Sequence, residues 1–154
     1  MGAQTLFVTN SFSPICTSPL DVEFNLRSSA DDLAKGLFSI QVLNAGAPTE
    51  VNIPTAPNRH TLQLTTYSRA FPARIHLPLT YEGTFELKLD TDHQPLIGYD
   101  ANAPDPSGTG RHRTVQYYNT SPGIIKGGVS WVPDKVGPGS VSVDAFNGSI
   151  SLSL

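Results

Sequence analysis

The sequence has little of several features that would point to particular classes of protein. It contains a single cysteine, Cys16, so no disulfide within the chain can staple the fold. Only 15% of the residues are charged, and 10 basic against 13 acidic residues leave a formal net charge of -3. Such a balance creates no field that gathers phosphates, so nucleic acid is not an expected partner.

Long apolar runs are absent as well. No stretch approaches the roughly 20 residues of a membrane-spanning helix, and residues 1–8 lack the basic region and apolar core of a signal peptide. We therefore expect a cytoplasmic protein without a membrane span, with secretion by another route left open. The four histidines are dispersed and form no close ligand pair, so the sequence predicts no metal site and no cofactor.

Short stretches in which apolar and polar residues alternate dominate the chain. A period of two is typical of half-buried β-strands, and 13 glycines and 13 prolines supply the turns between them. The clearest stretches are residues 20–26, 38–42, 51–53, 62–64, 75–77, 85–89, 115–117, 129–131, 141–143 and 150–152. They predict one all-β domain over residues 1–154, with about ten or eleven strands.

The strands come in pairs that resemble one another. Ile53-Pro54 and Leu77-Pro78 close two of these pairs at a spacing of 24 residues. Similar units cover residues 37–54, 60–78, 84–100 and 140–154, with a looser copy at 113–132. Repeated strand pairs predict either a β-solenoid-like stack, in which each unit buries the next, or a sandwich-like domain.

One short helix is expected over residues 29–36. Ser29 is a favourable N-cap, Asp31 and Asp32 suit the first turn, and Lys35 followed by Gly36 suits the end. A helix of one or two turns serves as a connector rather than as a layer of the fold.

Three stretches resemble a known group of proteins. They are LTYEGTFEL at residues 79–87, DPSGTGRHRTV at 105–115 and FNGSISL at 146–152. Together they resemble a group of fungal, mainly mushroom-type, repetitive β-rich proteins of unknown function, which are distantly similar to bacterial adhesin-like β-repeat domains. The resemblance spans roughly residues 15–154 and departs from the pattern at 67–70 and 90–93. It implies a repetitive all-β fold without an established activity.

The longest segment without strand pattern, residues 99–113, is the first candidate for a binding site, because functional side chains concentrate on long loops. Arginine offers a fork of donors to phosphate or carboxylate, and aromatic faces stack on a base or a sugar. The candidate ligand-binding residues here are Asp100, Asp105, Arg111, His112, Arg113 and the neighbouring Tyr117. The alternative is that Asp105 accepts hydrogen bonds within its own turn and pairs with Arg111.

Trp131 completes the candidate set. Its ring would serve as a sugar-stacking platform if it faced solvent, and the alternative is an ordinary core aromatic.

Two functions follow from these residues. One is a non-catalytic recognition or structural domain, adhesin-like or lectin-like, that binds carbohydrate or another protein and self-associates through exposed sheet edges. The other is a small hydrolase or nuclease toxin that uses His112 or His93 with Asp100, Asp105, Arg111 and Tyr117. The sequence leaves the question of catalysis open.

Overall fold

A computed structural model describes residues 3–10, 19–27, 36–57, 60–91, 93–133 and 135–154. Every regular element in these ranges is a β-strand, which confirms the all-β prediction. The strands are β1 (Ala3–Asn10), β2 (Leu20–Asn25), β3 (Leu37–Asn44), β4 (Thr49–Thr55), β5 (Thr61–Ser68), β6 (Ala73–His76), β7 (Gly83–Leu89), β8 (Leu96–Gly98), β9 (Thr114–Ser121), β10 (Ile124–Ser130), β11 (Gly139–Ala145) and β12 (Ile150–Ser153).

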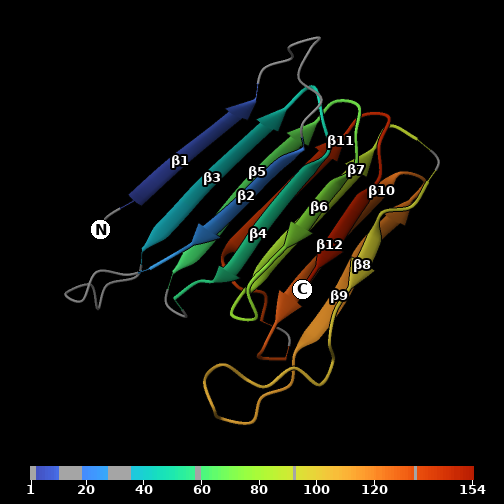
Figure 1. The fold of residues 1–154 in the computed structure, drawn as a ribbon. Coiled ribbons are helices and arrows are strands. Elements are labelled where there is room, and N and C mark those ends of the chain that lie inside the picture. Colours follow the sequence, from blue (N-terminus) through green and yellow to red (C-terminus); the bar gives the residue numbers. More distant parts are fainter. Residues whose placement is uncertain (1–2, 11–18, 28–35, 58–59, 92, 134) are drawn as a thin grey trace.

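The strands form two sheets that face each other as a sandwich (Figure 1). The seven-stranded sheet has the order β1-β3-β5-β11-β7-β10-β9, and the five-stranded sheet has the order β2-β4-β6-β12-β8. From β1 to β8 the chain alternates between the sheets, so each pair of consecutive strands contributes one strand to each layer. Neighbouring pairs are parallel within each sheet.

The chain departs from this simple stacking after β8. Strands β9 and β10 form an antiparallel hairpin at one edge of the seven-stranded sheet. The chain then returns to the middle of both sheets, where β11 lies between β5 and β7 and β12 lies between β6 and β8. The looser copy expected over residues 113–132 is a pair of strands too, but both of its strands belong to one sheet.

The core lies between the sheets and follows from the alternation of side chains. One row of the seven-stranded sheet joins Ile40, Leu64, Val141 and Phe85 through the strand register, and all four are buried. Val51, Ile75 and Leu152 form the facing row on the five-stranded sheet. The intervening residues point outward and are mostly Ser, Thr, Gln and charged side chains.

Polar side chains stabilise the corners where the chain passes from one sheet to the other. The Asn44 amide donates to Ala47 O at 2.8 Å and to Thr49 Oγ1 at 2.9 Å. In the next pair, Ser68 Oγ donates to Phe71 O at 2.9 Å. These contacts pair polar atoms that would otherwise be buried without partners.

Two expectations fall largely outside the described residues. The helix expected over 29–36 lies there except for Gly36, and Cys16 lies there too. Within the described ranges, no helix is long and apolar enough to cross a membrane.

Candidate functional site

The loop between β8 and β9 extends past the ends of the strands (Figure 1) and closes around Asp105. Asp105 accepts backbone N–H bonds from Ser107 at 2.9 Å, Thr109 at 3.1 Å and Arg111 at 3.0 Å. The Ser107 and Thr109 hydroxyls donate to the same carboxylate. Arg111 adds Nε at 3.2 Å and Nη2 at 2.9 Å, which leaves the Asp105 side chain 3% exposed.

The electrostatics of this loop follow from that arrangement. The Arg111 guanidinium, with the Ser107 and Arg111 backbone N–H groups, holds the pKa of Asp105 far below its usual range. Asp105 in turn raises the pKa of Arg111. Gly108 and Gly110 have φ of 69° and 74°, the left-handed conformation that lets the chain wrap tightly around the carboxylate. The Asp105–Arg111 pair is thus a clasp in which the Asp105 carboxylate and the Nε and Nη2 atoms of Arg111 bond within the loop.

The other predicted residues of the loop lie apart from this clasp. Asp100 Oδ1 accepts from Asn102 N at 2.8 Å and caps its own turn. His112 is exposed, and none of the hydrogen bonds of the described residues joins it to Asp100 or Asp105. Tyr117 packs edge-on against Phe85, with ring centroids 6.3 Å apart. Among the groups of the hydrolase or nuclease hypothesis, the hydrogen bonds of the described residues join only Asp105 and Arg111.

Arg113 and Trp131 meet inside the protein instead of on its surface. Trp131 is 1% exposed, which matches a core aromatic and leaves no ring face for a sugar. Its indole Nε1 donates to Leu79 O at 2.9 Å and its backbone N to Glu82 Oε1 at 3.0 Å. The Arg113 guanidinium lies over the ring at 5.7 Å from its centroid.

Arg113 is 5% exposed, and its three guanidinium nitrogens have no hydrogen-bond partner among the described residues. Burial lowers the pKa of Arg113. Glu82, which sequence reasoning missed, links the two halves of this region: it accepts from Trp131 N and lies 4.0 Å from Arg111 Nη1.

A different place on the molecule has open hydrogen-bonding groups, on the outer face of the seven-stranded sheet. A shallow groove of about 250 Å³ crosses β11, β7, β10 and β9 there. We call it the Tyr118 groove, and its outward side chains are Thr84, Glu86, Tyr118, Lys126, Ser140 and Ser142. Register places Ser140 beside Thr84, and Ser142 and Lys126 on either side of Glu86.

The tyrosine owes its position to an irregularity in the hairpin. The β9–β10 register shifts between Lys126 and Gly127, so Tyr118 is an extra residue in β9. The bulge leaves both Tyr117 and Tyr118 partly exposed, with Tyr118 53% exposed. Any Cβ at Gly128 would collide with the Tyr118 hydroxyl, so the absence of a side chain at Gly128 lets the ring lie close to the sheet.

Glu86 provides the negative charge in this groove. Its Oε1 is 2.9 Å from Lys88 Nζ and 3.1 Å from Lys126 Nζ. Hydrogen bonds from Lys88 and then Lys126 lower the pKa of Glu86, and Glu86 raises the pKa of Lys88. The closest contact of both lysines with Glu86 is therefore to Oε1.

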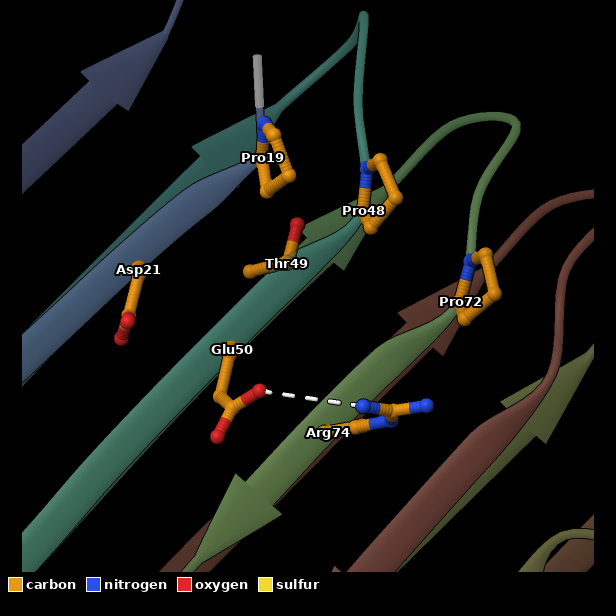
Figure 2. Close-up of a pocket in the computed structure, with 7 residues that line it drawn as sticks. All are labelled: Pro19, Asp21, Pro48, Thr49, Glu50, Pro72 and Arg74. Atoms are coloured by element: carbon orange, nitrogen blue, oxygen red, sulfur yellow. Dashed lines mark ion pairs between the residues drawn. The ribbon is translucent and has the colours of Figure 1, made fainter.

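A second hollow, of about 320 Å³, lies on the five-stranded sheet at the starts of β2, β4 and β6 (Figure 2). The rings of Pro19, Pro48 and Pro72 form a row along it. Glu50 Oε2 lies 3.9 Å from Arg74 Nη1, and Glu50 Oε1 lies 3.7 Å from His76 Nε2. Unlike the Tyr118 groove, this proline hollow has no aromatic side chain among its lining residues.

Sequence reasoning missed the Tyr118 groove, although parts of its signal were present. Alternation within β7 and β11 places Thr84, Glu86, Ser140 and Ser142 on outward positions. The contact between those two strands joins residues far apart in the chain, and only the fold shows it. No group of three or more His, Cys, Asp or Glu residues in the described ranges could hold a metal ion.

Comparison of the chain with protein-family models, with curated proteins and with solved structures finds no match.

Proposed function

We propose that the protein is a non-catalytic, lectin-like domain that binds carbohydrate in the Tyr118 groove. The observation that carries the proposal is an exposed aromatic ring held against a glycine beside a carboxylate, an ammonium group and hydroxyls. Sugar rings have apolar faces that pack on aromatic rings and rims of hydroxyls that need donors and acceptors. Tyr118 supplies the aromatic ring, and Glu86, Lys126 and Ser142 supply the donors and acceptors for the sugar hydroxyls.

The shape of the groove favours one sugar unit within a longer chain. Its volume of about 250 Å³ is below the roughly 300–1,000 Å³ of pockets that enclose a drug-sized ligand. An open, shallow groove on a sheet can bind one ring while the rest of the saccharide extends along the surface. Rows of hydroxyl and amide side chains on the same face, such as Gln63 and Thr65 on β5, would extend that contact.

The charge state of Glu86 supports binding over hydrolysis. The general acid of a glycoside hydrolase needs a raised pKa so that it holds a proton near neutral pH. The two lysines shift the pKa of Glu86 in the opposite direction. Glu86 is therefore an acceptor for sugar hydroxyls and a poor proton donor.

A glycan array probed with the full chain, followed by calorimetric titration of the best saccharide, tests this proposal. Replacement Tyr118→Ala should lower the affinity at least about tenfold, because a central aromatic anchor carries much of the binding energy. Replacement Gly128→Val should also lower it, because the new side chain displaces the tyrosine ring.

Tyr99→Ala is the matched control, since Tyr99 follows β8, outside the seven-stranded sheet, and is 47% exposed. The affinity of this control variant for the saccharide should equal that of the unmodified chain. The proposal fails if no saccharide binds at millimolar concentration, or if both tyrosine variants lose affinity equally.

A further inference from the structure

The last two strands of the chain occupy a slot in the middle of the sandwich. Strand β11 pairs in parallel with β5 on one side and β7 on the other, from Ser140 to Ala145 on both sides. Strand β12 pairs in parallel with β6 and β8. Residues 139–154 thus contact four strands, all of which come earlier in the sequence (Figure 1).

The slot and its occupant fit closely. All inward side chains of the segment are at most 8% exposed, namely Val141, Val143, Ala145, Ile150, Leu152 and Leu154. Without the segment, β5, β7, β6 and β8 would each present an open edge with unpaired backbone N–H and C=O groups. Such edges bind an added strand readily, because main-chain hydrogen bonds supply affinity and alternate side chains supply specificity.

The connection that brings the segment back is short and lies at the surface. Val129 of β10 and Gly139 of β11 pair with Gly83 from opposite sides, so the intervening residues must turn around the start of β7. Trp131 is the first residue of this connection. Its hydrogen bonds to Glu82 Oε1 and Leu79 O hold it in place. The side chains of Val132, Pro133, Lys135 and Val136 are exposed. We call residues 131–138 the hinge.

We propose that the slot also binds residues 139–154 of a second copy of this chain, so that two molecules can exchange their last strand pair. Every contact in the slot is the same whichever copy supplies the segment, and only the path of the hinge differs. The occupant is specified by four strand registers and six buried side chains together. This favours an identical segment over an unrelated peptide. The proposal is independent of saccharide binding.

A nicked form of the full chain provides the direct test. A protease recognition sequence inserted after Lys135 is cut under native conditions, with both pieces retained. A fluorescently labelled peptide of residues 139–154 is then added in about tenfold excess. If the labelled peptide and the chain's own segment bind the slot equally well, label should occupy about nine-tenths of the slots by mass action. Gel filtration with fluorescence detection measures the labelled fraction.

Two controls make the exchange specific. The peptide with Val143→Asp and Leu152→Asp should not enter, because it would bury two unpaired charges. A chain nicked after Gly108, in the loop between β8 and β9, should take up no more label than the uncut chain. If the unmodified peptide stays out of the hinge-nicked protein, or the charged peptide enters equally well, the proposal is wrong.

Hinge length tests exchange between whole chains. Deletion of residues 132–137 leaves too little chain to turn around the start of β7, so folding should require a second copy and give a dimer in light scattering. A hinge lengthened by about six Gly and Ser residues should permit return within one chain and give a monomer at low concentration. A shortened-hinge protein that is a folded monomer, or that folds at no concentration while the peptide also fails to exchange, contradicts the proposal.

Discussion

The loop between β8 and β9 and the Tyr118 groove use similar residues in opposite ways. In the loop, Asp105 and Arg111 face each other, and the surrounding hydroxyls and backbone N–H groups also bind the carboxylate. In the groove, Glu86 contacts Lys88 and Lys126 through Oε1, beside an exposed tyrosine. A cluster of charge in a loop can thus serve as a structural unit, whereas we propose that the sheet face binds a ligand.

The difference has a physical basis in the backbone. A loop must satisfy its own N–H groups, and a carboxylate is an efficient common acceptor for several of them. Strands satisfy their N–H groups through the ladder, so their outward side chains are not needed for that purpose. The sheet can therefore keep Glu86 and Tyr118 in place without using up their binding capacity.

The largest effect is expected from a change beneath the groove. Leu87 lies between Glu86 and Lys88 on β7, and its side chain is fully buried. Leu87→Ala should lower the free energy of unfolding by about 2–5 kcal/mol, the usual cost of a cavity of this kind. Urea denaturation measures this. Leu96→Ala, at a leucine that is 68% exposed, should change the free energy of unfolding by no more than about 0.5 kcal/mol. Equal losses in the two variants would contradict the burial of Leu87 and the exposure of Leu96.

A smaller effect of opposite sign is expected beside the loop. Arg113 is a buried cation whose nitrogens have no partner among the described residues, and an uncompensated buried charge is costly. Arg113→Met keeps much of the packing on Trp131 and should raise the free energy of unfolding by about 1–3 kcal/mol. Thermal and urea unfolding measure the change. The matched variant Arg74→Met, at an exposed arginine, should have almost no effect, and a destabilised Arg113→Met protein would show that the guanidinium is paired.

The smallest effect concerns the clasp, and it depends on pH. The pKa of Asp105 is far lower in the folded protein than its unfolded value of about 3.9. Its contribution to stability is therefore present above that value and is lost as the pH falls below it. In Asp105→Asn this loss is absent, so stability should fall less between about pH 5 and pH 3 than in the unmodified chain. The midpoint of urea denaturation, measured at several pH values in this range, tests the prediction. Asp90→Asn, at an exposed aspartate, is the control. If stability changes with pH in the same way in both variants and in the unmodified chain, the clasp is contradicted.

Much of the fold could be predicted from local patterns. Alternation at Phe85, Glu86 and Leu87 identified a strand and its inner face, because a period of two depends only on neighbouring residues. The insertion of β11 between β5 and β7 could not be predicted, since parallel pairing of distant strands leaves no local signal. That both strands of the β9–β10 hairpin lie in one sheet could not be predicted for the same reason.

The candidate site was harder to predict than the fold. The loop drew attention through its prolines, glycines and charges, and the alternative in which Asp105 pairs with Arg111 matches the geometry. Burial of Arg113 and Trp131 depends on how the loop lies against residues 79–82, which no pattern within the loop indicates. The position of Tyr118 depends on one extra residue in β9, and sequence alone does not show where a bulge falls.

The central position of β11 and β12 also affects how the protein forms during synthesis. Residues 139–154 leave the ribosome after all the strands with which they pair, and both sheets stay divided until then. Pairing between strands so distant in sequence is slow, because loop closure costs entropy before contacts repay it. Until then, the earlier strands expose apolar side chains and unpaired edges to solvent. Aggregation therefore competes with folding during this period. We expect the yield of folded protein to depend on how quickly translation proceeds from β10 through residues 139–154.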